Sequence, residues 1–164
     1  MANKKILFLC LENATRSLMA EAIFRHLFGQ HWEVFSAGLN SGGPHPLMLS
    51  ALAERGIQTN ALVSKNLSEL PRYRFDVVVT LSPGADDLAQ ELEGNPFVVH
   101  LPFDDPAQLG GNHEERADAF RRVRDQIFGR LNVMGHRMET ELICEEQQRQ
   151  FKNPLNLSMV SGFF

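Results

Sequence analysis

The 164-residue sequence has only two cysteines, Cys10 and Cys144, and no apolar run near the ~20 residues that span a bilayer. A disulfide scaffold and a membrane anchor are therefore excluded. Acidic residues outnumber basic ones by 20 to 16, which argues against a nucleic-acid-binding protein, because such proteins carry a basic excess. Lys4 and Lys5 precede a short apolar run, but no small-residue cleavage site follows. We therefore expect a cytoplasmic protein that does not bind membranes.

Motifs for metals and nucleotides are also missing. The six histidines show neither HExxH nor His-x-His spacing, and the sequence contains no GxGxxG and no Walker loop. We therefore expect no metal, no nucleotide and no other cofactor. His100 falls within an apolar run and is interpreted as a histidine that packs in the core or against a loop.

Short apolar runs alternate with amphipathic segments along the chain. Strands are predicted over Ile6–Leu9, Glu33–Ala37, Phe75–Leu81 and Phe97–Leu101, and helices over about 17–28, 47–55 and 84–92 and from about 112 onward. The strands are apolar throughout, as strands buried on both faces are. The alternation predicts an α/β fold with a four-stranded parallel sheet covered by helices on both faces. Ligands bind beyond the carboxyl ends of such strands.

The last predicted helix carries an apolar stripe that continues past Gly135. Apolar residues recur at steps of three or four from Phe120 to Leu142, so one long helix reaches about Gln150, or two helices meet at Gly135. Asn112 and Glu115 form a plausible capping pair at its start. Four arginines cluster on this stretch and are interpreted as a solvated helix face: Arg116, Arg121, Arg122 and Arg124.

The stripe is longer than one face of a small domain requires. We expect a catalytic domain over residues 1–138 and a C-terminal helical extension over 139–164. An overhanging apolar stripe must be buried elsewhere. We expect either self-association as a homo-oligomer through residues 131–164, or docking of Phe163 and Phe164 onto the core.

The segment Cys10–Arg16 has the spacing Cys-x5-Arg and joins a predicted buried strand to a predicted helix. Backbone N–H groups of such a loop converge on one point, and helix N-termini bind anions. Arg16 adds a planar fork that suits two oxygens of a tetrahedral anion. The same positive field lowers the pKa of a thiol. Cys10 is therefore predicted to be a thiolate that faces a bound oxyanion.

The residues between and beside Cys10 and Arg16 are the predicted oxyanion-binding loop: Leu11, Glu12, Asn13, Ala14, Thr15 and Ser17. Asn13 tolerates the left-handed backbone that a tight anion loop often needs. Ser17 either caps the following helix or donates a hydrogen bond to the thiolate, and both roles are compatible.

Asp105 and Pro106 follow the fourth predicted strand. Attack of a thiolate on a phosphate ester requires a proton for the leaving oxygen, and a carboxyl group at the same sheet edge can supply it. Pro106 holds the preceding residue in an extended conformation. Asp105 is therefore the candidate general acid.

Several motifs together resemble the low-molecular-weight protein tyrosine phosphatases. They are Cys10–Ser17, Met19–Ala22 and Ser36–Gly38, while Phe103–Ala107 and Phe120–Asp125 are similar to the branch that includes the thioredoxin-coupled arsenate reductases. The resemblance covers about residues 4–135. It implies a four-stranded parallel sheet with Cys10 as nucleophile, Arg16 as oxyanion binder and Asp105 as general acid.

The sequence departs from the phosphatases of this family at three places. Thr15 stands where they usually carry a second cysteine, and Glu12 stands where they usually have glycine. The Glu12 carboxylate either repels the anion or points to solvent. Phosphotyrosine specialists often have aromatic residues after Asp-Pro, whereas Ala107 and Gln108 follow here.

The sequence also departs from the reductases. Their two further cysteines are missing from residues 82–89. Some of these reductases bind a cation through residues that match Asn13, Glu21 and Ser36 and through an aspartate, at whose position Lys65 stands here. Because the lysine ammonium can replace the ion, the resemblance implies no metal.

The loop residues and the family resemblance together support three candidate functions. The first is hydrolysis of phosphate monoesters through a cysteinyl-phosphate on Cys10. The second is arsenate reduction with an external thiol or glutaredoxin, or with Cys144 as the internal partner. Glutamates near Cys144 should raise its pKa, so we expect it not to act as a resolving cysteine. The third is an oxyanion sensor without catalysis that presents its C-terminal extension to a partner.

Overall fold

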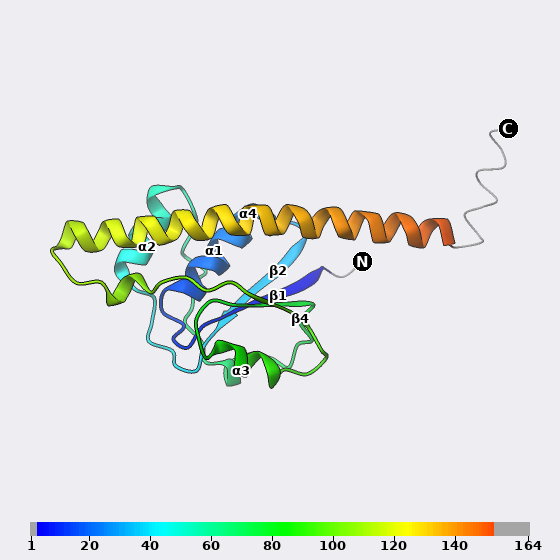
Figure 1. Ribbon diagram of the computed structural model, residues 1–164, viewed down its shortest axis with the longest axis horizontal. Coiled ribbons are helices and arrows are strands. Elements are labelled where there is room, and N and C mark those ends of the chain that lie inside the picture. Colours follow the sequence, from blue (N-terminus) through cyan, green and yellow to red (C-terminus); the bar gives the residue numbers. More distant parts are fainter. Residues whose placement is uncertain (1–2, 153–164) are drawn as a thin grey trace. The chain divides into compact units, whose positions relative to one another are not determined.

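The structure, a computed structural model, describes residues 3–152. Its four strands are β1 (Lys4–Leu9), β2 (Trp32–Ala37), β3 (Val77–Thr80) and β4 (Phe97–His100). They form one parallel sheet in the order β2-β1-β3-β4 (Figure 1). All of β3 and the last four residues of β1 are buried, as their unbroken apolar sequence predicts. The predicted fold class is confirmed.

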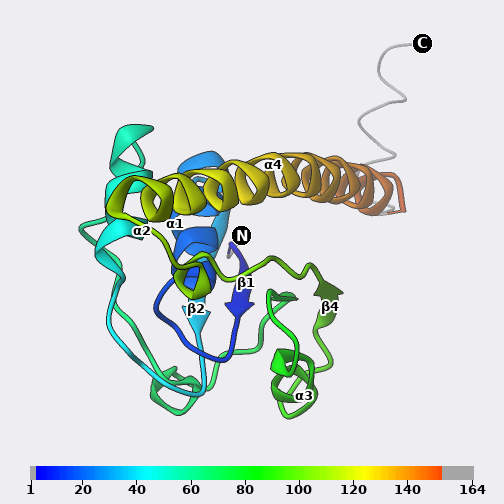
Figure 2. The same ribbon diagram turned by 60° about the vertical axis from the view of Figure 1, so that its left-hand side comes forward.

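Helices cover the two faces of the sheet. They are α1 (Arg16–Phe28), α2 (Pro46–Glu54), α3 (Ala85–Gln90) and α4 (His113–Lys152), with short 3-10 turns η1 (Leu67–Glu69) and η2 (Pro106–Gln108). Figures 1 and 2 show α1 and α2 over one face and α3 over the other. The third strand is shorter than predicted, because its pairing with β1 begins only at Val77.

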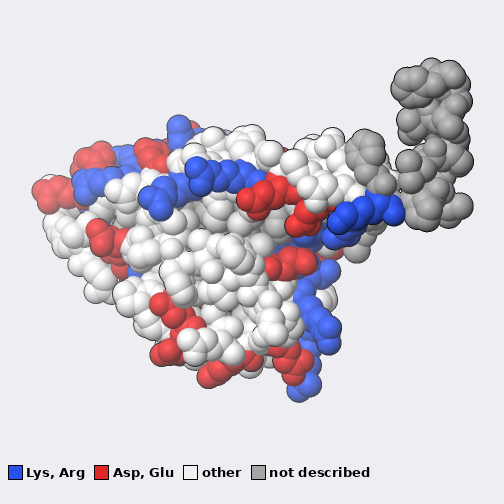
Figure 3. All heavy atoms as spheres, turned by 45° about the vertical axis from the view of Figure 1, so that its right-hand side comes forward, with Lys and Arg blue, Asp and Glu red and all other residues white. Residues whose placement is uncertain are grey.

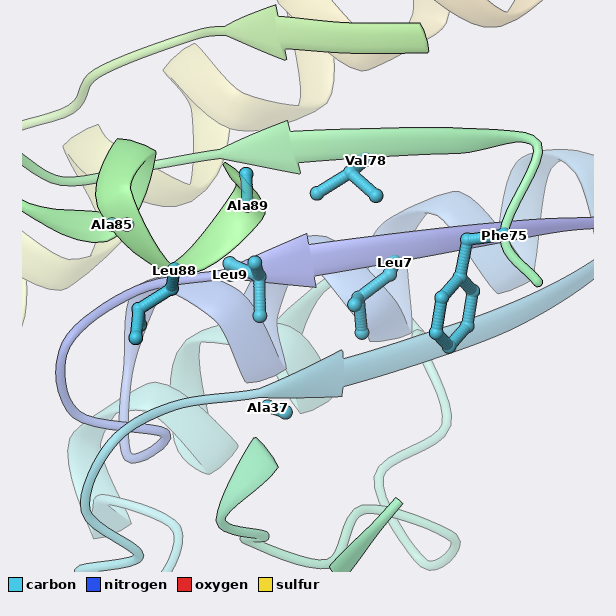
Figure 4. Packing of buried hydrophobic residues seen from close by; sticks show 8 residues of the cluster. All are labelled: Leu7, Leu9, Ala37, Phe75, Val78, Ala85, Leu88 and Ala89. Atoms are coloured by element: carbon cyan, nitrogen blue, oxygen red, sulfur yellow. The ribbon is translucent and has the colours of Figure 1, made fainter. Parts of the chain in front are cut away.

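Apolar side chains fill the space between the sheet and α3. Figure 4 shows this cluster, which contains Leu7, Leu9, Ala37, Phe75, Val78, Ala85, Leu88 and Ala89. Each fully buried leucine stabilises the fold by about 1.5–3 kcal/mol relative to an exposed one. This packing fixes β1 and β3 beside each other, so the loops that follow them start at one edge of the sheet.

Helix α4 is one continuous helix that runs through Gly135 to Lys152. The predicted capping pair is present: Glu115 N–H donates to Asn112 Oδ1 at 2.9 Å. The chain divides into two compact units, one ending at Leu131 and one beginning at Asn132. In the first unit the apolar stripe is buried at Phe120, Val123, Ile127 and Leu131. In the second unit Met134, Met138 and Leu142 are half-buried. Phe163 and Phe164 lie outside the described residues.

The arginine cluster of α4 is only partly a solvated face. Arg122 is exposed, but Arg124 is buried and donates to the Ala51 carbonyl at 2.7 Å and to Glu54 at 3.1 Å. Arg121 also pairs with Glu54, at 2.9 Å. The interpretation of these residues as solvated is therefore wrong for Arg124, because the end of α2 supplies carbonyl and carboxylate partners that sequence spacing does not reveal.

The surface carries charges of both signs. Figure 3 shows acidic and basic side chains interspersed on the face drawn there. Within residues 3–152, no helix has a stretch both long and apolar enough to cross a bilayer.

Candidate active site

Three loops begin at the carboxyl edge of the sheet, because the strands end in register. Leu9 of β1 pairs with Thr80 of β3, and Thr80 pairs with His100 of β4. The loop that starts at Cys10 follows β1 directly. Leu11 N–H donates to Ser82 Oγ at 3.2 Å, which ties this loop to the one after β3.

Cys10 is fully buried and belongs to a chain of hydrogen bonds. Its thiol donates to the Glu12 carbonyl at 2.6 Å, and its sulfur lies 2.8 Å from Ser17 Oγ. Asn13 Nδ2 donates to Ser17 Oγ at 2.7 Å. Since the thiol has one proton and gives it to Glu12, the Ser17 hydroxyl donates to the sulfur. Ser17 therefore contacts the Cys10 sulfur, and α1 begins without a side-chain cap.

The prediction of a lowered pKa at Cys10 is wrong. Burial raises the pKa of this thiol above its ordinary value, and the negative charge of Asp105 adds to the rise. Hydrogen bonds from Ser17 and the charge of Arg16 act in the opposite direction without cancelling the effect of burial. Burial therefore favours the neutral thiol, and the Glu12 carbonyl lies within hydrogen-bonding distance to accept its proton.

Replacing Ser17 with alanine should raise the pKa of Cys10 further, because it removes a donor that stabilises the thiolate. The rate of alkylation by iodoacetamide, measured against pH, should then rise only at higher pH than in the unaltered protein. Ser82→Ala is the control, since Ser82 contacts the loop backbone and not the sulfur. An unchanged profile in Ser17→Ala would show that this hydroxyl does not set the thiol pKa.

The loop amides do not all converge on one point. The N–H of Leu11 donates to Ser82, and the N–H of Asn13 donates to the Asn40 carbonyl at 3.0 Å. Asn13 is also not left-handed: among residues 3–152, Asn95 is the one residue other than glycine with a positive φ. That expectation for Asn13 is wrong, because its side chain, rather than its backbone, supports the loop.

The Asn13 side chain joins three segments. Its Nδ2 donates to Ser17 and to Ser36 Oγ at 3.1 Å, while its Oδ1 accepts the N–H of Lys65 at 2.7 Å. Ser64 Oγ donates to the Asn13 carbonyl. Asn13 thereby fixes the loop to β2 and to the segment before η1.

The cation site of some relatives does not fit these residues. Lys65 Nζ lies 3.8 Å from Glu21 Oε1, so an ammonium already supplies positive charge beside this buried carboxylate. Burial raises the pKa of Glu21, and Lys65 and Arg25 oppose that rise. A metal cation placed here would face the ammonium as a like charge. Glu12, the acidic residue of the Cys10 loop, is exposed, so its side chain points to solvent.

Arg16 and Asp105 lie together beside the thiol. Arg16 Nη1 donates to the Phe103 carbonyl at 3.0 Å, and its Nη2 lies 3.6 Å from Asp105 Oδ2. Asp105 Oδ1 accepts the N–H of Ala107 at 3.0 Å and so caps η2. Asp105 is half-buried, whereas its neighbour Asp104 is exposed. The structure therefore brings together Cys10, Arg16 and Asp105.

Sequence reasoning missed His45, which sits against the loop. The backbone N–H of His45 donates to the Ala14 carbonyl at 3.0 Å, and the imidazole ring stacks on the Phe120 ring with centroids 4.6 Å apart. Burial and the charge of Arg116 lower the pKa of His45, while Asp105 opposes this. Prolines on both sides of His45 at the start of α2 were the available signal.

His100 is not a packing histidine, as predicted, but an exposed one. Its Nδ1 lies 2.8 Å from Thr80 Oγ1 and 2.8 Å from Asp86 Oδ1, and its side chain is 57% exposed. The prediction is wrong because a strand at the sheet edge leaves its last residue open to solvent.

Large apolar side chains lie exposed on the loops of the site. Leu11, in the Cys10 loop, lies against Gly84. The backbone N–H of Leu39 donates to the Leu11 carbonyl at 2.9 Å. Leu109 directly follows η2, and Asp105 directly precedes it. All three side chains are more than a third exposed. Such a rim suits a ligand with an apolar part.

A sequence profile described as "Low molecular weight phosphotyrosine protein phosphatase" matches residues 5–143. The chain belongs to this family. Its members are enzymes, phosphatases and arsenate reductases among them, so the resemblance seen in the sequence is confirmed.

Relatives within the family include arsenate reductases. One from Halalkalibacterium halodurans is 39% identical over 132 residues, covering 80% of this chain and 95% of the relative. One from Bacillus subtilis is 38% identical over 131 residues, with coverage of 80% and 94%. Among solved structures, a mutant of YwlE from Bacillus subtilis has a TM-score of 0.69 at 25% identity, covering 84% and 99%. An arsenate reductase in its oxidized state has a TM-score of 0.68 at 27% identity, covering 79% and 95%.

Proposed function

We propose that the chain hydrolyses phosphate monoesters through a phosphorylated cysteine. The observation that carries this proposal is the pair formed by Arg16 and Asp105 beside the buried sulfur of Cys10. A guanidinium there can hold phosphate oxygens, and a carboxyl group at its side can exchange a proton with the ester oxygen.

The reaction has two steps. The Cys10 thiol gives its proton to an oxygen of the phosphate dianion, its sulfur forms a bond to phosphorus, and the ester P–O bond breaks as Asp105 gives its proton to the leaving alcohol. Water then attacks the phosphocysteine while Asp105 takes a proton from it, the S–P bond breaks, and a phosphate oxygen returns the proton to the sulfur as phosphate leaves. Arg16 and the free amides of the loop hold the phosphoryl oxygens in both steps.

Two further features favour an ester over an inorganic oxyanion. The exposed side chains of Leu11, Leu39 and Leu109 can contact an apolar leaving group, which arsenate lacks. In addition, residues 82–89 contain no cysteine that could complete a reduction. A relative in fold, the YwlE arginine phosphatase, has been solved as a cysteine-to-serine mutant with a phosphorylated serine in its active site. This supports phosphoryl transfer to the side chain of Cys10.

Arsenate reduction with an external thiol is the second candidate, because relatives at 38–39% identity are named arsenate reductases. Arsenate would condense with the Cys10 thiol with loss of water. A second thiol, from a small molecule or glutaredoxin, would attack the Cys10 sulfur. Arsenic would leave as arsenite, reduced by two electrons, and the two sulfurs would form a disulfide.

Two assays separate these candidates. The purified protein is given an aryl phosphate in one and arsenate with glutathione and glutaredoxin in the other. Phosphate release without arsenite formation is the expected result. Arsenite formation without phosphate release would put the reductase first. Protection of Cys10 by phosphate without either turnover would instead indicate the oxyanion sensor.

Cys144 should not take part in either reaction. It is exposed on α4 within the second unit. We expect Cys144→Ala to leave aryl-phosphate hydrolysis unchanged and any arsenite formation to depend wholly on added thiol. The measurement is mass spectrometry after stoichiometric arsenate without added thiol. A disulfide between Cys10 and Cys144 in that sample would contradict the expectation.

We further propose that residues 1–138 are the catalytic domain and that residues 139–164 are an extension that serves self-association. Truncation after Arg137 should then lower the mass seen by light scattering and leave Cys10 reactive toward iodoacetamide. The half-buried Met138 and Leu142 are the physical reason, since a second apolar surface would cover them. A monomer of equal thermal stability with and without the extension would argue against this role.

A further inference from the structure

Arg116 is a partly buried cation without a carboxylate partner. Among residues 3–152, the arginines that are not exposed are Arg16, Arg25, Arg116, Arg121 and Arg124. The other four each have a carboxylate oxygen at 2.9–3.6 Å. No ion pair joins Arg116 to a carboxylate of the described residues. Because a partly buried charge without a counter-ion is costly, this guanidinium favours an anion from outside the protein.

Arg116 lies next to the candidate active site. It precedes Phe120 by four residues in α4, so the two side chains share one face of the helix. Phe120 stacks on the His45 ring, and the backbone N–H of His45 donates to the Ala14 carbonyl within the Cys10 loop. The charges of Arg116 and Asp105 act on the pKa of His45 in opposite directions.

His45 offers a hydrogen-bond donor at this place. Its Nδ1 accepts the N–H of Leu47 at 3.1 Å, so the proton of the neutral ring is on Nε2. Burial and the charge of Arg116 lower its pKa and keep the ring neutral. The imidazole N–H and the guanidinium are therefore two hydrogen-bond donors, while Asp105, the carboxylate whose charge acts on the same imidazole, pairs with Arg16.

We propose that Arg116 and His45 form a second anion-binding site beside the phosphate site, which binds an acidic group on the substrate. The substrate class is a phosphopeptide with aspartate or glutamate next to the phosphorylated side chain. A peptide also fits the exposed apolar residues Leu11, Leu39 and Leu109, which an inorganic anion would leave uncovered. This inference rests on the proposed phosphatase function and adds the selectivity of the same site.

The test compares two phosphotyrosine peptides that differ only in flanking residues, Asp and Glu in one and Asn and Gln in the other. Dissociation constants are measured by calorimetry in the full-length Cys10→Ala protein, which has no nucleophile at this position, so that binding is read without turnover. We expect the acidic peptide to bind about tenfold more tightly at low salt, as one charge-assisted contact can provide. The preference should shrink as salt is added.

Arg116→Gln should abolish this preference, so that the two peptides bind with about equal dissociation constants. Arg116→Lys should retain part of the preference because the positive charge remains. Arg122→Gln is the matched control, since Arg122 is on the same helix and exposed, and it should keep the full preference. Equal binding of the two peptides by the Cys10→Ala protein, or a preference that survives Arg116→Gln, would overturn the inference.

The same peptides separate this inference from the proposed function. Phosphate release by the protein with Cys10 intact tests hydrolysis alone. If no phosphate is released while the Arg116-dependent preference persists, the phosphatase proposal fails and the second anion site stands. If phosphate is released equally well from both peptides and their affinities are equal, the phosphatase proposal stands and the second site does not exist.

Discussion

Replacing Cys10 with serine is expected to abolish hydrolysis of an aryl phosphate. A hydroxyl at this buried position is a far weaker nucleophile than a thiolate, and any phosphoserine that forms has a poorer leaving group than a phosphocysteine, so turnover stops. Binding of inorganic phosphate should persist, because Arg16 is untouched. Phosphate release and calorimetric phosphate binding are the two measurements.

Arg16→Lys should also lose most turnover, by about 10²–10³-fold, because an ammonium cannot form the two parallel hydrogen bonds of a guanidinium. The control is Arg122→Lys, an exposed arginine on α4. Undiminished hydrolysis by Cys10→Ser would falsify the mechanism. Full activity of Arg16→Lys would mean that positive charge alone suffices at this position.

Asp105→Asn is expected to slow hydrolysis of esters with poor leaving groups by about 10²–10⁴-fold, because the amide cannot donate the proton that the leaving oxygen needs. Esters with acidic leaving groups, such as nitrophenyl phosphate, should be affected less. The measurement is kcat across a series of aryl phosphates whose phenols differ in pKa. The slope of log kcat against that pKa should become steeper in the variant.

Asp104→Asn serves as the matched control, since Asp104 is the adjacent carboxylate but is exposed, whereas Asp105 pairs with Arg16. We expect a much smaller change and an unaltered slope in this variant. A greater loss in Asp104→Asn than in Asp105→Asn would transfer the role of general acid to the neighbouring residue.

The fold and three residues of the candidate site could be predicted because their signals are local. Strand and helix periods are visible in the sequence, and parallel strands bring their carboxyl ends to one edge. Cys10 and Arg16 are six residues apart within one connection, and Asp105 precedes a proline after the last strand. Each of these positions follows from its neighbours in sequence.

The other features of the candidate site depend on contacts between segments that are distant in the sequence. The pKa of Cys10 is raised because the whole domain buries the sulfur, which no loop motif reports. The Asn13 side chain accepts a hydrogen bond from Lys65, 52 residues away. His45 stacks on Phe120 of α4, and neither the loop around His45 nor the motif that begins at Phe120 indicates this contact. Such pairings become visible only in three dimensions.

The hydrogen bond from the Cys10 thiol to the Glu12 carbonyl also bears on how this sulfur withstands oxidants. Hydrogen peroxide attacks the thiolate, and the first product is a sulfenic acid. A buried sulfur that keeps its proton on a backbone carbonyl reacts slowly by that route. Thr15 stands beside Arg16, so no second cysteine of the loop is available to trap a sulfenic acid as a disulfide. Burial of the sulfur and its hydrogen bond to the Glu12 carbonyl are therefore the two features of this loop that slow its oxidation.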